Sequence, residues 1–154
     1  IIKAQGLRLV LVKGYPSPWG QAAKTIFEIK GLDFLVAAQE AGGTNEELVA
    51  WSGENSGPVV AWNDEKPISR WLDILMLAER LAPTPSLVPD NVHDRALMIG
   101  LANELCGELG LGWNRRGRFC DNQWCCRGLQ FRDRQPSVAD QQNQQLYGWS
   151  HRHL

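Results

Sequence analysis

A strand followed at once by a helix is the feature of this sequence that most constrains its fold. The segment Leu7–Val12 is apolar on both faces except for Arg8, a pattern typical of a strand that is covered on two sides. Ser17 then suits a helix N-cap, Pro18 suits the first helical position, and Gly31 suits a left-handed helix end. The chain is therefore expected to build an α/β sheet from its first thirty or so residues onward.

Two further segments extend this pattern. Residues 33–38 are predicted to form a second strand, and residues 44–47 resemble a capping box that begins a short second helix before Leu48 and Trp51. A helix that connects two strands in this way is typical of a parallel pair.

A proline-led hairpin and a third helix come next. Pro58 precedes the short apolar run Val59–Trp62, and the turn that follows predicts a hairpin with Ile68. Apolar residues at helical spacing predict a helix over Trp71–Leu81, with Ser69 available as its N-cap. The predicted order is β-α-β-α-β-β-α, which we expect to form a four-stranded mixed sheet with flanking helices.

This order resembles the thioredoxin-like N-terminal domain of glutathione S-transferases. The motifs that carry the resemblance are Ser17-Pro18 at the first helix and Gly57-Pro58-Val59 at the third strand. Residues 77–96, with a proline-rich joint in their middle, resemble the family's passage into its all-helical second domain. The resemblance divides the chain into a thioredoxin-like domain (1–82), a linker (83–90), the first helix of an incomplete all-helical region (91–116) and an atypical tail (117–154).

The resemblance also implies a binding site for glutathione as co-substrate. Ser17 matches the residue that faces the glutathione sulfur, and Pro58 matches a cis-proline that faces Ser17 across a cleft. Val59 matches the residue whose backbone pairs with the tripeptide. Trp19 is expected to form a wall of the ligand cleft.

The start of the third helix departs from the family pattern. Where the family has an acidic residue and a serine that hold the γ-glutamyl end, this chain has Arg70 and Trp71. Arg70 could bind the carboxylate of that end with help from Ser69. The amino group then lacks its acidic partner, for which the hairpin residues Asp64 and Glu65 are candidates.

Two functions follow from the resemblance and stay open at this point. One is a glutathione S-transferase that conjugates glutathione to a small electrophile, with Ser17 as its catalytic residue. The other is a non-catalytic binding or assembly module with the same fold. The family's habit of forming dimers implies a homodimer in either case.

Composition excludes several other classes of protein. Lys plus Arg is 16 and Asp plus Glu is 17, so no overall positive charge indicates a nucleic-acid partner. No apolar run approaches the ~20 residues of a membrane span. The first residues show no secretory leader, so a cytoplasmic location is expected.

The tail differs in composition from the rest of the chain. Residues 117–154 hold three of the four cysteines, five arginines and a glutamine-rich stretch. A shifted reading frame or an alternative exon explains this change, and a divergent native tail explains it equally well. Cys120, Cys125 and Cys126 share the tail with His151 and His153 but lack the paired spacing of zinc sites, so no metal is expected. Cys106 is expected to be a small buried apolar residue.

Overall fold

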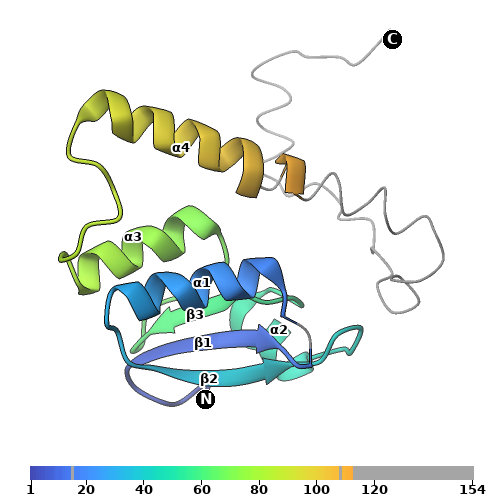
Figure 1. Cartoon of the computed structure of the whole chain (residues 1–154). Helices are drawn as coiled ribbons and strands as arrows, with labels where there is room; N and C mark the ends of the chain where they lie inside the picture. The colour runs from blue at the N-terminus through green and yellow to red at the C-terminus, as the bar shows by residue number, and fades with distance from the viewer. Residues whose placement is uncertain (15, 108, 113–154) are drawn as a thin grey trace, which may run out of the picture.

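The structure is a computed structural model that describes residues 1–14, 16–107 and 109–112. The predictions for the tail at 117–154, including its cysteines, lie outside these residues. Three strands and four helices follow one another in the order β1 (Leu7–Val12), α1 (Pro18–Ile29), β2 (Phe34–Gln39), α2 (Glu46–Ser52), β3 (Val59–Trp62), α3 (Trp71–Leu81) and α4 (Val92–Cys106). Figure 1 shows the thioredoxin-like arrangement of the first six elements, with α4 set apart from the sheet.

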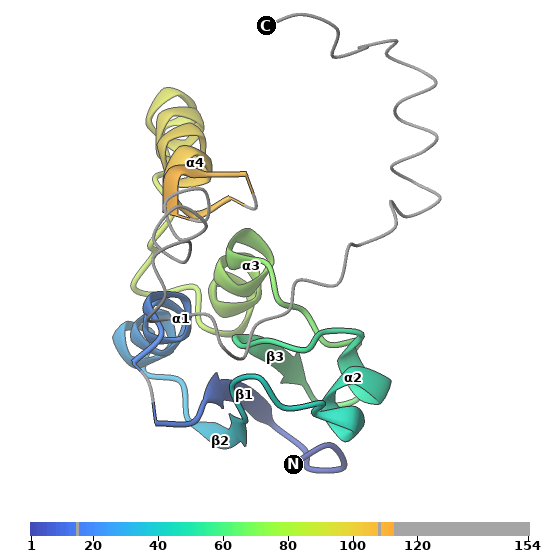
Figure 2. The same ribbon diagram turned by 90° about the vertical axis from the view of Figure 1, so that its right-hand side faces the viewer.

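The sheet is mixed and has the strand order β2-β1-β3. β1 is parallel to β2, with Leu9 opposite Val36, and antiparallel to β3, with Leu9 opposite Val60. α1 and α3 cover one face of the sheet, while α2 and the N-terminal segment lie on the other (Figure 2). The predicted fold class is confirmed.

The core lies between the sheet and the α1/α3 layer. Because side chains alternate along a strand, Leu7 and Leu9 of β1 point toward these helices and are almost fully buried. They pack against Phe27 of α1 and Ile74 of α3, both about 1% exposed or less. This packing of β1 against α1 and α3 determines where the ends of the two helices lie.

The other face of β1 carries Arg8, the one charged residue of this strand. Arg8 is 2% exposed, and its guanidinium lies 5.3 Å from the ring centre of Trp51 in α2. Its Nη atoms donate to the backbone carbonyls of Ile1, Ile2 and Asn63. Arg8 therefore fastens the N-terminal segment and α2 to the sheet by means of carbonyl groups and an aromatic face.

The expected fourth strand is reduced to a single bridge. Ile68 exchanges two backbone hydrogen bonds with Val60, each 2.8 Å long, but it belongs to no longer ladder. The expected pairing partner is thus correct, whereas the four-stranded sheet is not. Pro67 prevents the pairing from extending beyond Ile68 in the N-terminal direction, because it has no N–H to donate to a ladder.

Two predicted helix caps are wrong. Asn45, and not Thr44, is the N-cap residue of α2, and its side chain bonds Glu40, Gly43 and Asn55 in place of the helix. Arg70 is the N-cap residue of α3 in extended conformation, one position later than the predicted Ser69. The Ser69 hydroxyl instead donates to Glu54, which lies 15 residues earlier in the sequence.

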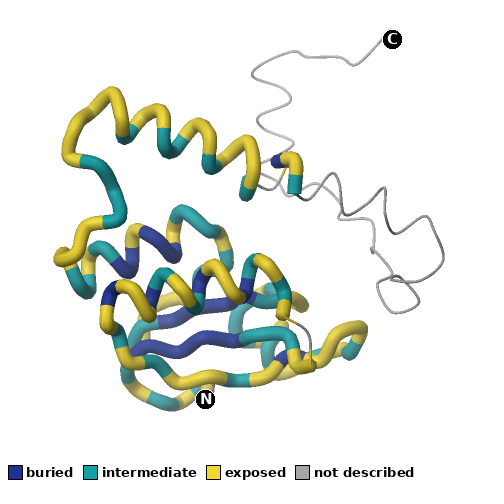
Figure 3. The backbone as a smooth tube through the Cα atoms, viewed as in Figure 1, coloured by how far each residue is buried: buried dark blue, intermediate teal, exposed yellow. Residues whose placement is uncertain are grey.

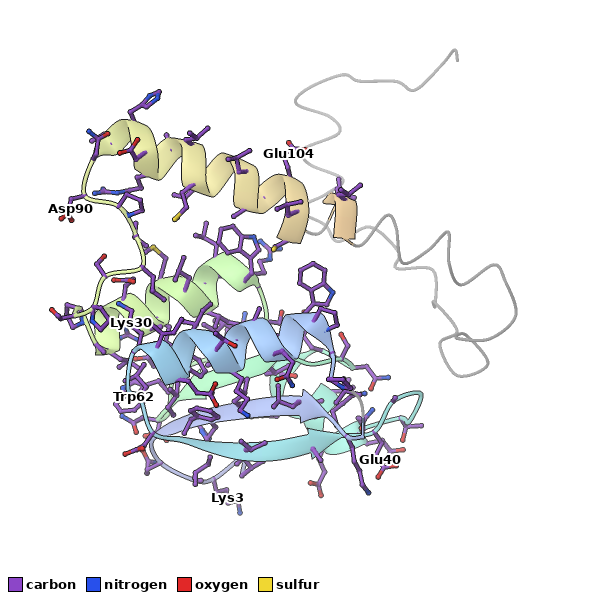
Figure 4. All side chains as sticks on the ribbon, in the orientation of Figure 1. Lys3, Lys30, Glu40, Trp62, Asp90 and Glu104 are labelled. Carbon is purple, nitrogen blue, oxygen red and sulfur yellow. The ribbon has the colours of Figure 1, made fainter. Side chains whose placement is uncertain are left out.

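A buried ion pair holds the joint between α3 and α4. Lys30, at the end of α1, donates to Glu79 at 2.7 Å and to the carbonyls of Ala82 and Pro85, and its side chain is completely buried. Glu79 also accepts from the Leu87 N–H and from Ser86. Figure 4 labels Lys30 at the α1 end nearest this joint. The Thr84–Pro85 bond in the joint is cis.

α4 begins at a well-made cap but buries little. The Asn91 side chain accepts from the N–H groups of His93 and Asp94, as an N-cap should. None of its residues is buried, and Leu97, Leu101 and Leu105 are each more than half exposed (Figure 3). Cys106 is half-buried, contrary to its expected full burial, and burial raises the pKa of its thiol. No helix within the described ranges has the length and apolarity to cross a membrane.

Removing the charge of Glu79 should lower the stability of the fold at neutral pH and make that stability depend less on pH. Burial acts to raise the pKa of Glu79, but hydrogen bonds from Lys30, Leu87 and Ser86 and the Lys30 charge outweigh it and lower that pKa. The pair therefore adds stability above about pH 4.5, which is lost as the pH falls through the lowered pKa. Glu79→Gln should reduce the free energy of unfolding at pH 7 by about 3 kcal/mol, because it leaves a buried lysine unpaired.

Urea unfolding from pH 3 to pH 7 measures both effects. Glu65→Gln is the matched control, because Glu65 pairs with Arg80 at 2.5 Å on an exposed surface. The control should leave the pH 7 midpoint nearly unchanged. Equal midpoints for Glu79→Gln and wild type would contradict the role given to Lys30.

Candidate functional site

Ser17 stands at the N-terminus of α1 with its hydroxyl unused by the helix. It is half-buried and has φ −58° and ψ 125°, and Pro18 follows it as the first helical residue. The Ser17 carbonyl accepts from the Gln21 N–H at 2.8 Å, but its side chain makes no capping hydrogen bond. Ser17 is therefore the N-cap residue, as predicted, but its side chain does not cap the helix. What remains beside the hydroxyl is the partial positive charge of a 12-residue helix.

The Gly57–Pro58 bond is cis, as the resemblance implied. Gly57 lies directly against β1, since a Cβ there would stand 2.9 Å from the Val10 carbonyl oxygen and 3.4 Å from the Leu11 Cα. Pro58 and Val59 are buried, and Val59 is the register partner of Val10.

The same end of β1 also receives the start of α1. A Cβ on Gly20 would lie 2.8 Å from Leu11 Cδ2 and 3.8 Å from Ser17 Cβ. Leu11 thus lies between Gly20 of α1 and Gly57, and it brings Ser17 and the segment 57–59 to one end of the central strand. The cleft expected between Ser17 and Pro58 stays a prediction.

A polar cavity opens at the start of α3. Its volume is about 300 Å³, and its walls include three predicted glutathione-binding residues: Val59, Ser69 and Arg70. Glu54, from the loop before β3, also lines it and accepts from the Ser69 hydroxyl at 3.2 Å. Ser17, Trp19 and Pro58 are not among its lining residues, nor do they line a second cavity that lies beside α2.

The cavity at α3 contains charges of both signs. Glu54 and Asp73 contribute carboxylates, while Lys66 and Arg70 contribute cations. Such a lining can bind a small group that carries an ammonium and a carboxylate together, because each charge meets an opposite one.

The acidic partners suggested by the sequence lie elsewhere. Asp64 accepts from the Gln5 side chain at 3.1 Å, and Glu65 pairs with Arg80. Sequence reasoning missed Glu54, which stands next to Gly53 with its left-handed φ of 79°. A glycine at position 53, four residues before Gly57, was the sequence signal that the chain can turn there.

Two tryptophans connect this region to α4. The Trp71 Nε1 donates to the Asn103 side chain at 3.1 Å, so this tryptophan joins the start of α3 to α4. The ring of Trp19 lies against Gly112, where a Cβ would come within 2.6 Å of it. Trp19 and Trp71 therefore extend from the first turns of α1 and α3 to the C-terminal end of α4.

The described residues offer no metal centre: nowhere among them do three histidine, cysteine or acidic side chains gather closely enough to hold an ion. Cys106 is not activated either, since burial disfavours its thiolate. The chemistry available to this end of the domain consists of a hydroxyl at a helix N-terminus, a buried β3 backbone and a mixed-charge cavity.

Solved structures share the backbone fold of about two thirds of the chain. A Tau class glutathione S-transferase from mango matches with a TM-score of 0.59 at 25% identity, over 67% of this chain and 46% of that one. A glutathione S-transferase from Rhodospirillum rubrum matches with a TM-score of 0.55 at 26% identity, over 63% and 43%. The chain has a glutathione S-transferase fold.

A third match is a rice glutathione transferase in complex with glutathione, with a TM-score of 0.56 at 24% identity, over 75% of this chain and 59% of that one. The chain spans about half the length of these glutathione S-transferases. No family model and no curated protein matches the sequence.

Proposed function

We propose that the chain binds glutathione and acts as a glutathione S-transferase toward a small electrophile. The observation that carries this proposal is the cavity at α3, which unites Val59, Ser69, Arg70 and Glu54 next to β3. The γ-glutamyl end of glutathione carries one ammonium and one carboxylate, which match the mixed charges of that cavity. The fold it shares with glutathione S-transferases supports the same assignment.

In this proposal glutathione lies along the segment 58–59 with its γ-glutamyl end toward α3. Arg70 binds the carboxylate of that end and Ser69 assists it, while Glu54 accepts from the ammonium. The Val59 backbone pairs with the peptide, and the sulfur points to Ser17. Trp19 forms a wall of the cleft on the side of α4.

Ser17 then performs the chemistry of the site. Its hydroxyl donates to the glutathione sulfur, and the N-terminus of α1 favours the thiolate over the thiol. The thiol proton leaves to solvent, and the thiolate attacks the electrophilic carbon of the second substrate; with an activated aryl chloride the new C–S bond replaces the C–Cl bond and chloride leaves. Catalysis distinguishes this proposal from a non-catalytic module, which would bind glutathione without turnover.

A homodimer and a cytoplasmic location complete the proposal. The apolar stripe Leu97, Leu101 and Leu105 on α4 is exposed in the single chain, and a second copy would cover apolar surface of this kind. Glutathione and reduced thiols are characteristic of the cytoplasm.

Ser17→Ala should separate catalysis from stability. We expect turnover with an activated aryl chloride to fall at least ~10-fold, the equivalent of ~1.4 kcal/mol of transition-state stabilisation, because the thiolate loses its donor. Since Ser17 makes no capping hydrogen bond, the thermal midpoint and the Kd for glutathione should hardly change. Robust conjugation that survives this substitution would exclude Ser17 from the chemistry.

Glu54→Gln should weaken glutathione binding by about tenfold, because the ligand ammonium loses a carboxylate in a partly enclosed cavity. Calorimetry with glutathione and with its deamino analogue measures the effect. Wild type should prefer glutathione, and Glu54→Gln should lose most of that preference. Asp64→Asn is the matched control, since Asp64 contacts Gln5 on an exposed loop. An undiminished preference in Glu54→Gln would contradict the role of Glu54.

A further inference from the structure

β2 is an open edge of the sheet. It pairs with β1 along one side, and no strand of the described part of the chain pairs with its other side. Figure 1 shows β2 as the outermost strand. A strand at an edge presents unpaired N–H and C=O groups, to which another extended chain can bond.

The usual devices that protect an edge are missing from β2. Its sequence, FLVAAQ, contains no charge and no proline, and it runs the full length of β1. Val36 is 57% exposed on the face toward α1, and Leu35 is 49% exposed on the opposite face. The edge is therefore apolar on both sides as well as open.

A cavity of about 590 Å³ lies beside this edge, on the face of the sheet that carries α2. Its apolar lining residues come from β1, β2, α2 and the N-terminal segment, with Val10, Ala37, Leu48 and Trp51 among them, and they are mixed with polar residues of the segment 43–47. Arg8 supports two of its walls, because it bonds the backbone of Ile1 and Ile2 and lies over the Trp51 ring.

The charged residues that line this cavity are acidic. They are Glu40, Glu46 and Glu47, and none of its described lining residues is basic. Glu40 pairs with Lys13 at 3.0 Å, whereas Glu46 and Glu47 stand in the first turn of α2. Figure 4 shows Glu40 beyond the end of β2. Asp33 adds a further acidic residue just before the other end of the strand.

A lining that combines apolar residues with carboxylates matches a lysine or arginine side chain. The aliphatic stem of such a residue can contact the apolar residues while its charged head reaches a carboxylate. An extended peptide bonded to the edge would direct alternate side chains to this face of the sheet. One extended peptide could therefore pair its backbone with β2 and place a side chain in the cavity.

We propose that β2 and the adjoining cavity form a docking surface for an extended peptide segment in which apolar residues alternate with lysine or arginine. The segment adds to the free side of β2 as a further strand. One basic side chain enters the cavity between β2 and α2, and the others meet the acidic residues at the two ends of the strand. The cavity lies on the opposite face of the sheet from α1 and α3, and the docking surface does not depend on glutathione.

The test uses the full chain and three labelled peptides of roughly ten residues. The first alternates valine with lysine, the second has glutamate in place of lysine, and the third repeats the first with two central prolines. Fluorescence anisotropy should give the first peptide a Kd at least about tenfold lower than either of the others. Hydrogen exchange at the amides of β2 should slow when it binds.

Matched variants locate the binding site. Val36→Lys should weaken the lysine peptide at least about tenfold, because it places a like charge on the edge. Met76→Lys is the control, since Met76 is 43% exposed on α3, and it should leave binding unchanged. The double change Glu46→Gln and Glu47→Gln should weaken the lysine peptide and spare the glutamate one.

Three outcomes would overturn the proposal. One is equal affinity for the lysine and glutamate peptides, and another is unchanged binding by a folded Val36→Lys variant. The third is self-association of the chain that Val36→Lys abolishes and the lysine peptide does not inhibit, because the edge would then serve a second copy. Hydrogen exchange on wild type decides the matter even if Val36→Lys fails to fold.

Discussion

The buried ammonium of Lys30 is the interaction on which the arrangement of the domain depends. It joins the end of α1, Glu79 of α3 and the carbonyls of the joint in one place, with no part of its side chain in solvent. A lysine is removed from water at great cost unless its three protons find acceptors, and here all three do. The position of the joint, and so the start of α4, follows from that requirement.

The site depends on a second constraint, which is the crowded end of β1. A side chain at Gly20 or at Gly57 would meet atoms of Leu11. The two glycines therefore allow α1 and the loop before β3 to approach β1. Ser17 and Val59 consequently share one end of the sheet. The cavity at α3 lies at the far side of β3, where Glu54 and Ser69 bond each other across 15 residues of sequence.

Much of the fold could be predicted from local patterns. The apolar run Leu7–Val12 and the periodic run Trp71–Leu81 have the predicted bounds, and Gly31 has the left-handed φ of 64° expected of a helix end. These features depend on a residue and its near neighbours. The cap at Ser69 was wrong because a hydroxyl bonds whichever partner folding brings close, which here is Glu54. Glu54 was missed for the same reason, since its place in the cavity is set by Ser69 and β3.

The claim at the centre of this account is that the mixed-charge cavity at α3 receives the γ-glutamyl end of glutathione. Amide chemical shifts of the ¹⁵N-labelled chain, recorded during a titration with reduced glutathione, test it most directly. We predict saturable changes at Glu54, Val59, Ser69 and Arg70, with the amides of β2 unaffected. Saturable changes confined to other parts of the domain, or none at millimolar glutathione, would contradict the account.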